Sequence, residues 1–278
     1  MRYTLLQGGV RTAFPDYAVT PEYDTMRILL TNDDGIESHG LSALREALAG
    51  HHELWVIAPE DERSGSSHGV SVSIPVRVRE RDERIYAVDG TPADCVLLGI
   101  RFLIPAEVDA VVSGINHGPN LGTDILYSGA VGAARQGALM GKPSYAFSLC
   151  GKPTEREAFL PSAAKARELL EIMFPLASAE HFVNVNFPYP LPDAPLTAVC
   201  FPSQRIYRDH YESFRAPDGS LYCFLSAEGS SSVHEPGSDF HAIEQGRIAV
   251  SPLAVRPINH AVENRYRMSI AERNRNEL

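Results

Sequence analysis

The fold of this chain can be inferred outward from the residues Ile28-Leu29-Leu30-Thr31-Asn32-Asp33-Asp34-Gly35. Its apolar half predicts a buried β-strand, and the strand runs directly into two adjacent carboxylates and a glycine. In a parallel sheet, ligands bind just beyond the carboxyl ends of the strands. Two carboxylates at that position favour a hard divalent cation such as Mg²⁺ or Mn²⁺. Asp and Gly are also common in plain turns, so the rest of the chain has to decide between the two interpretations.

The segments around this stretch alternate between strand and helix patterns. Residues 38–49 carry leucines at helical spacing, and residues 54–58 form a second apolar strand stopped by Pro59. This order implies a parallel pair joined by a right-handed crossover. Further strands are predicted over 85–88, 109–112, 144–149 and 182–187, and further helices over 91–102, 128–140 and 155–173. We expect residues 70–78 to form an edge or bulged strand, because they alternate and include Pro75.

This pattern predicts a doubly wound α/β core over residues 26–187, with a mostly parallel sheet. After Pro188 the chain is punctuated by prolines and continues into hairpin-like segments over 197–225. A last strand at 248–250 would return to the core. We therefore expect residues 188–278 to form a β-rich extension that serves oligomerisation. Residues 1–25 lack a signal-peptide pattern and are expected to be a loose extension, with Met26 as an alternative start.

Charge and composition exclude several classes of protein. The formal net charge of −10 argues against binding to nucleic-acid polymers or membrane surfaces, which requires a basic face. No apolar run approaches the roughly 20 residues of a membrane span. The four cysteines match no zinc motif, and those in apolar stretches are expected to be buried thiols. We expect a soluble cytoplasmic protein.

Two further loops follow predicted strands and carry polar or small residues. Residues 63–69 contain Ser64 and His68, and residues 113–122 contain Asn116, His117 and Asn120 before a helix that starts near Ser128. Small residues and helix N-termini let backbone N–H groups approach an anion. Asn116 can offer a neutral oxygen to a cation, while Asn120 and Ser128 can donate to phosphate. Each loop alone is a weak signal, but at the strand ends of one sheet all three would converge on one crevice.

The chain resembles the survival protein SurE family in several separate motifs that occur in the same order along the sequence. Members of that family are metal-dependent nucleoside monophosphatases. The motifs are Met26–Gly35, Ala58-Pro59 through Ser64-Gly65, Gly90–Val96, Val112–Asn116 through Asn120–Gly122, Tyr127–Gly129, Gly237–Phe240 and Val250–Leu253. The resemblance extends from Met26 to about residue 255.

The resemblance implies a SurE-like Rossmann-type three-layer core and a C-terminal extension that exchanges between subunits of a homodimer or homotetramer. It carries the metal ligands over onto Asp33, Asp34, Ser64 and Asn116, with one divalent cation, Mg²⁺ or Mn²⁺, per subunit. The implied activity is that of a 5′-nucleotidase acting on nucleoside monophosphates. 3′-Nucleotides and short polyphosphate are further candidate substrates.

Catalytic roles are assigned as hypotheses. Asp33 and Asp34 would hold the cation, and Asp33 could also orient or deprotonate the attacking water. Asn120 and Ser128 would hold the phosphoryl oxygens. His68, and less so His117, could give a proton to the leaving ribose oxygen. Ala130 stands where many relatives have Thr, which leaves the reaction class intact but can alter rate and substrate preference.

Three rival functions remain for comparison. A haloacid-dehalogenase-type phosphatase needs a carboxylate two residues after its nucleophilic Asp, whereas Gly35 occupies that position after Asp33. A dinucleotide-binding oxidoreductase would need a GxGxxG motif after the first strand, which is missing. A non-catalytic nucleotide-binding or assembly module is the alternative from another class, and the intact set of oxygen ligands argues against it.

Overall fold

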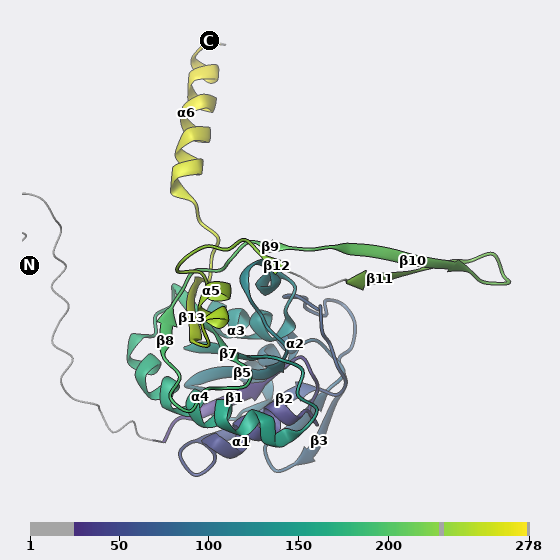
Figure 1. Cartoon of the computed structure of the whole chain (residues 1–278), viewed down its shortest axis with the longest axis vertical. Helices are drawn as coiled ribbons and strands as arrows, with labels where there is room; N and C mark the ends of the chain where they lie inside the picture. Colours follow the sequence, from purple (N-terminus) through teal and green to yellow (C-terminus); the bar gives the residue numbers. More distant parts are fainter. Residues whose placement is uncertain (1–24, 228–230, 277–278) are drawn as a thin grey trace, which may run out of the picture.

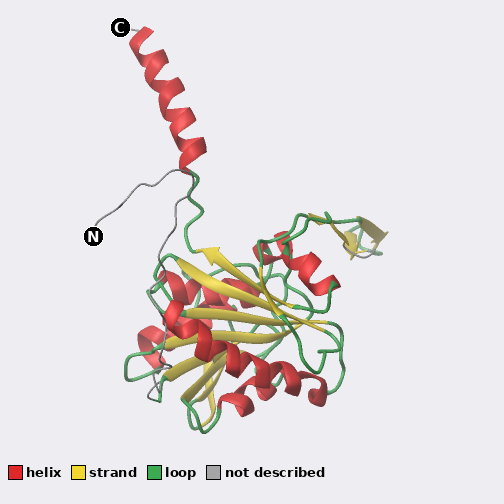
Figure 2. Ribbon diagram, turned by 60° about the vertical axis from the view of Figure 1, so that its left-hand side comes forward, coloured by secondary structure: helices red, strands yellow, loops and turns green. Residues whose placement is uncertain are grey.

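The computed structural model describes residues 25–227 and 231–276 of the chain, so all but the last residue of the predicted N-terminal extension lies outside the described residues. Figure 1 and Figure 2 show helices on both faces of a central sheet, with a hairpin and a C-terminal helix projecting from this body. Across the described ranges, no helix combines the length and the apolar character that crossing a bilayer would require.

A nine-stranded sheet forms the middle layer, with strand order β3-β4-β2-β1-β5-β6-β7-β13-β8. Its strands are β1 (Arg27–Thr31), β2 (Glu53–Pro59), β3 (Val78–Asp82), β4 (Ile85–Val88), β5 (Ala110–His117), β6 (Ser144–Cys150), β7 (His181–Pro188), β8 (Thr197–Val199) and β13 (Ile248–Ala254). The six strands from β4 to β7 in this order are parallel, whereas β3 and β13 pair antiparallel with β4 and β7. The predicted mostly parallel α/β sheet is therefore confirmed.

Alternation along the buried strands divides the core between the two faces of the sheet. In β1, Ile28 and Leu30 belong to the hydrophobic cluster on one face of the sheet, and Leu29 belongs to the cluster on the other face. The first cluster includes residues of α1 (His39–Leu48) and α4 (Leu160–Met173). The second includes residues of α2 (Pro92–Leu98) and α3 (Gly129–Leu139). The result is the three-layer arrangement that the sequence predicts.

Short helical segments join these elements. They are the π-helix η1 (Gly99–Leu103) and the 3-10 helices η2 (Gly122–Leu126), η3 (Arg156–Phe159) and η4 (Phe174–Leu176). The helix predicted over 155–173 is thus divided, because η3 precedes α4 and Pro161 lies in the first turn of α4.

The region after Pro188 contributes both to the sheet and to the projections. Two strands, β10 (Asp209–Arg215) and β11 (Leu221–Ala227), form an antiparallel hairpin that extends away from the body in Figure 1. A second small sheet pairs β9 (Arg205–Ile206) with β12 (Ser231–Ser232), followed by α5 (Asp239–Glu244). The helix α6 (His260–Asn276) was not predicted, because it lacks a strong apolar stripe and its described side chains are almost all exposed.

The expected strand over 70–78 is wrong in position. Strand β3 begins only at Val78, and Val72 and Ile74 are 75% and 64% exposed. The segment before it is held by α2 instead, because Asp94 accepts hydrogen bonds from the backbone N–H of Ser71 at 2.9 Å and from its hydroxyl at 2.7 Å. The charged residues of β3 then form the exposed edge of the sheet.

Strand β5 is longer than the predicted strand over 109–112, because a bulge carries it through the glycine of the loop. Ser113 pairs with Ala146, but Asn116 pairs with Ser148, so one extra residue is accommodated on β5 between the two pairs. Bulges beside a site re-aim the side chains that follow them. Asn116 is therefore positioned by a strand, not by a flexible loop.

Candidate active site

Asp33 and Asp34 lie at the carboxyl edge of the sheet, where the chain leaves β1. Strands β2 and β5 flank β1 on opposite sides, so the sheet reverses its direction of growth here. Ligand crevices open at such switch points. Asp33 is 3% exposed and lines a cavity of about 450 Å³. Asp34 lines a neighbouring cavity of about 380 Å³, and Ser64 borders both.

Burial raises the pKa of both adjacent carboxylates. Burial raises the pKa of Asp33 to about 7, and the charge of Asp34 adds to the rise, while backbone N–H groups of Ala130 and Gly129 lower it. Burial also raises the pKa of Asp34, which the backbone N–H of His117 partly offsets through a 2.9 Å hydrogen bond. Asp33 Oδ1 is buried without a hydrogen-bond partner. A cation beside this oxygen would relieve both the missing contact and the repulsion.

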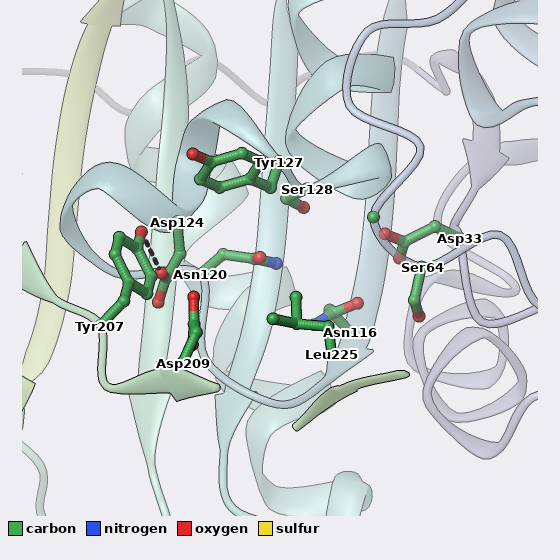
Figure 3. Close-up of a pocket in the computed structure, with 11 residues that line it drawn as sticks. Asp33, Ser64, Asn116, Asn120, Asp124, Tyr127, Ser128, Tyr207, Asp209 and Leu225 are labelled. Atoms are coloured by element: carbon green, nitrogen blue, oxygen red, sulfur yellow. Dashed lines mark hydrogen bonds between the residues drawn. The ribbon is translucent and has the colours of Figure 1, made fainter. Parts of the chain in front are cut away.

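Asn116 and Ser64 present oxygens to the same place. The Asn116 amide nitrogen donates to the Gly118 carbonyl at 2.9 Å, which leaves the amide oxygen free. Figure 3 shows that oxygen directed toward Asp33 and Ser64. The Ser64 hydroxyl donates to Glu62 at 2.9 Å, so its oxygen lone pairs remain available. Together with the carboxylates this is an oxygen-only donor set, which suits Mg²⁺ or Mn²⁺.

The start of α3 forms the next wall of the cavity. Ser128 caps this helix by accepting the Val131 backbone N–H at 3.1 Å, and its own hydroxyl hydrogen remains free to donate. A Cβ on Gly129 would lie 2.9 Å from the Asp33 Cβ atom and 2.5 Å from the Ser66 hydroxyl. Only glycine lets the helix approach the carboxylate this closely. Ala130, where the resemblance leads us to expect Thr, is fully buried.

Asn120 lines the cavity and is held by polar residues that sequence reasoning missed. Its amide nitrogen donates to the Ser148 hydroxyl at 2.8 Å, and its backbone N–H donates to Asn186 at 2.9 Å. Its carbonyl oxygen accepts from Asn184 and Asn186 at 2.8 and 3.0 Å. Asn184 and Asn186 alternate with apolar residues inside the buried strand β7, and that was the available signal.

The base of the projecting hairpin closes the far end of the cavity, which sequence analysis did not predict. Tyr207, Asp209 and Leu225 line it, and Figure 3 shows Tyr207 and Asp209 on the side away from Asp33. The Tyr207 hydroxyl donates to Asp124 at 2.7 Å, and its ring meets that of Tyr127 edge-on with centroids 6.2 Å apart. Asp124 also pairs with the buried Arg205 at 2.8 Å. These contacts join the hairpin to the loop that carries Asn120.

The two predicted histidines lie differently relative to the other site residues. The His68 ring nitrogen Nε2 lies 2.8 Å from the Gln136 side-chain oxygen in α3, and His68 is not among the residues that line either cavity. His117 borders the smaller cavity, beside Asp34. A role for His68 as proton donor stays a prediction.

Comparisons with known proteins match most of the chain to one protein family. The family described as survival protein SurE matches residues 28–210. The 5′-nucleotidase SurE of Pelobacter propionicus is 39% identical over 246 residues, covering 85% of this chain and 96% of the relative. A 5′-nucleotidase SurE of an Anaeromyxobacter species is 41% identical, covering 85% and 93%. The crystal structure of the SurE protein from Aquifex aeolicus superposes with a TM-score of 0.73 at 36% identity, covering 85% and 96%. The chain therefore belongs to the survival protein SurE family.

Proposed function

We propose that this protein is a divalent-cation-dependent 5′-nucleotidase that releases inorganic phosphate from nucleoside monophosphates. Its relatives are named 5′-nucleotidases at about 40% identity over most of the chain, which supports a hydrolase of phosphoric monoesters. The observation that carries the proposal is the cavity itself: Asp33, Ser64 and Asn116 offer oxygens at one end, and Tyr207 and Asp209 lie at the other.

The residues present fit a hard cation. Asp33, Asp34, Asn116 and Ser64 would hold it, since the buried Asp33 oxygen has no other partner and the Asn116 amide oxygen is free. A bound Mg²⁺ or Mn²⁺ would polarise a phosphoryl oxygen and lower the pKa of a bound water. We propose one cation per subunit.

The protein groups position the phosphate and water. The Ser128 hydroxyl and the Asn120 amide would donate to phosphoryl oxygens, and the hydrogen bonds of Asn120 with Ser148, Asn184 and Asn186 support a fixed position for it before substrate binds. Asp33 either orients the attacking water or accepts its proton, in addition to binding the cation. Preorganised donors of this kind stabilise charge as it shifts during phosphoryl transfer.

The tyrosine end of the cavity supports a nucleoside as the remainder of the substrate. Tyr127 and Tyr207 offer aromatic surface to a base, and Asp209 can accept hydrogen bonds from ribose hydroxyls or base N–H groups. A cavity of about 450 Å³ falls within the usual range for small-molecule sites. 3′-Nucleotides and short polyphosphate remain candidate substrates of the same site.

We also propose that the protein acts as a homodimer or homotetramer assembled through its C-terminal extension. The hairpin exposes a row of aromatic side chains, Phe214, Tyr222 and Phe224, that stack on one another. Exposed apolar patches of this kind mark interaction surfaces. Helix α6 projects separately from the body in Figure 1.

The test is phosphate release from a panel of 5′- and 3′-nucleoside monophosphates and short polyphosphate, with EDTA and then with Mg²⁺ or Mn²⁺ restored. We expect EDTA to abolish release and either cation to restore it. Asp34→Asn should reduce activity by at least about 100-fold, because even changes around a metal ligand cost 10- to 100-fold. The control is Asp193→Asn, an exposed carboxylate far along the chain.

Two results would contradict the proposal. Full activity and full metal affinity in the Asp34→Asn variant would show that the adjacent carboxylates do not hold the cation. Nucleotide binding that needs no metal and yields no phosphate would instead favour a non-catalytic binding module.

A further inference from the structure

A second cluster of metal-binding side chains lies outside the cavity, on and beside α5. Donor atoms of His234, His241 and Glu244 lie within 4.8 Å of one another. His241 and Glu244 are three residues apart on α5, so they project from the same face of the helix. His234 reaches them from the segment that precedes α5. Among the described residues, this is the one such group of three histidine, cysteine or acidic side chains.

Two of the three donors are already at the separation that a metal requires. His234 Nδ1 lies 3.1 Å from a carboxylate oxygen of Glu244. In a tetrahedral site with bonds of about 2.0 Å, neighbouring ligand atoms are about 3.3 Å apart. The rings of His234 and His241 meet edge-on with centroids 4.8 Å apart. A side-chain rotation that moves the third donor by roughly 1.5 Å would complete the triangle.

His241 has an unexplained buried nitrogen. Its Nδ1 atom is inaccessible to solvent and has no hydrogen-bond partner, whereas its Nε2 atom lies 2.9 Å from the Gln245 amide nitrogen. The two ends of a Gln amide are assigned from the hydrogen-bond network and can be exchanged. With the amide oxygen facing Nε2, the ring would donate there and leave the Nδ1 lone pair free. This is how ligating histidines are usually oriented.

The helix α5, which carries His241 and Glu244, is anchored at its start by hydrogen bonds. Ser238 caps α5 by accepting the backbone N–H of His241 at 3.2 Å, and Ser238 and Asp239 are both fully buried. Asp239 binds the backbone of Ser203 and Gly122. The donor atoms of His241 and Glu244 therefore project from a helix that is fixed at its start, and only the His234 segment has to adjust.

We propose that His234, His241 and Glu244 form a second metal site, specific for a borderline transition-metal ion such as Zn²⁺. Two imidazoles and one carboxylate suit Zn²⁺, Co²⁺ or Ni²⁺, in contrast to the oxygen-only set around Asp33. Water would fill the fourth position. A bound ion cross-links the segment around His234 to α5. The site is separate from the proposed nucleotidase chemistry and does not depend on it.

The test is the number of Zn²⁺ ions bound by the full-length protein after EDTA treatment and dialysis. The His241→Ala and His234→Ala variants should each bind one Zn²⁺ fewer than the wild type at a concentration that saturates the wild type. Glu244→Gln, which preserves shape, should weaken binding at this site by at least about tenfold. Co²⁺ added to the wild type should give the visible absorption of a tetrahedral ion, and the His241→Ala variant should lose that signal.

The matched control is His260→Ala. His260 also lies three residues before a glutamate, Glu263, with Nδ1 3.3 Å from its carboxylate, but among the described residues no third histidine, cysteine or acidic donor joins this pair. This variant should bind as much Zn²⁺ as the wild type. Equal stoichiometry in the wild type and both the His234 and His241 variants would overturn the second site. Phosphate release with Mg²⁺, measured in parallel, should stay unchanged in the His241→Ala variant.

Discussion

The Asp239 carboxylate in α5 accepts a hydrogen bond of 2.7 Å from the backbone N–H of Gly122. Its other oxygen accepts from the backbone of Ser203 at 2.9 Å. Gly122 lies between Asn120 and Asp124, which both line the cavity. A single buried carboxylate thus connects the C-terminal region to the loop that forms the candidate active site.

Removing this carboxylate should destabilise the protein and loosen the site. In Asp239→Ala, buried N–H groups lose their acceptor, at a cost of about 1–3 kcal/mol for each. We expect a lower free energy of unfolding in urea and a lower kcat/KM for nucleotides. Asp218→Ala is the control, because Asp218 accepts a comparable 2.9 Å bond from Ser220 on an exposed turn. An equal loss in both variants would contradict a special role for Asp239.

The burial of Asp33 predicts that the metal-free protein becomes less stable as pH rises. Its pKa is about 7 in the folded state, above the ordinary value of 3.8, so the folded state binds the proton more tightly. Stability should therefore fall as pH rises from about 4 through about 7. In EDTA at pH 8, Asp33→Asn should be more stable than the wild type by about 1–3 kcal/mol, and the two should converge near pH 4.

Urea unfolding at pH 5 and pH 8, with Asp193→Asn as the exposed control, measures this effect. Mg²⁺ should stabilise the wild type more than the Asp33→Asn variant, because ligands that bind only the folded state shift the equilibrium toward it. An Asp33→Asn variant that is less stable than the wild type at pH 8 in EDTA would contradict this prediction. It would show that burying the Asp33 carboxylate does not lower the free energy of unfolding as we expect.

Tyr207 should contribute to recognition of the base. Replacing it with Ala removes the ring that faces Tyr127, and stacking on an aromatic side chain is worth about 1–3 kcal/mol per base. We expect KM for 5′-nucleotides to rise roughly 5- to 100-fold, with little change for ribose 5-phosphate. Tyr207→Phe, which keeps the ring and loses only the hydroxyl contacts with Asp124 at 2.7 Å and Thr123 at 3.1 Å, should behave nearly as the wild type. Equal increases in KM for both substrates would exclude base stacking.

His68 can be tested as proton donor against a structural role. Its hydrogen bond to Gln136 and its absence from the cavity lining favour a structural contribution. For His68→Ala we expect an unchanged shape of the pH–rate profile and a lower melting temperature. The loss of one limb of the profile in this variant, but not in His51→Ala, would instead establish His68 as the proton donor.

The aromatic face of the hairpin should hold subunits together. Phe214 and Phe224 stack with centroids 5.9 Å apart and are 54% and 56% exposed. Light scattering after gel filtration should show a dimer or tetramer for the wild type and a smaller species for the double variant Phe214→Ser, Phe224→Ser. The matched control is Tyr266→Ser, an exposed aromatic residue on α6. A monomeric wild type would refute assembly through this hairpin.

Much of the fold follows from local patterns in the sequence. The signals are clear in the apolar runs of β1, β2, β6 and β7 and in the leucine spacing of α1. Each of these elements buries residues at its own regular spacing. Residues 70–77 and α6 were not predicted correctly, because these segments are largely exposed. Val72 and Ile74 look like strand residues but are exposed and lie outside β3, and α6 has little buried face from which a helix could be recognised.

Local sequence patterns were enough to locate the candidate site, because two carboxylates, a serine and an asparagine follow parallel strands that must end at one edge of the sheet. The direction of the Asn116 oxygen depends instead on long-range packing, through a bulge in β5, and so does the set of residues that close the cavity. Tyr207 and Leu225 come from a segment more than 80 residues beyond Asn120 in the chain. Such contacts depend on how distant elements pack, and local periodicity contains no information about that packing.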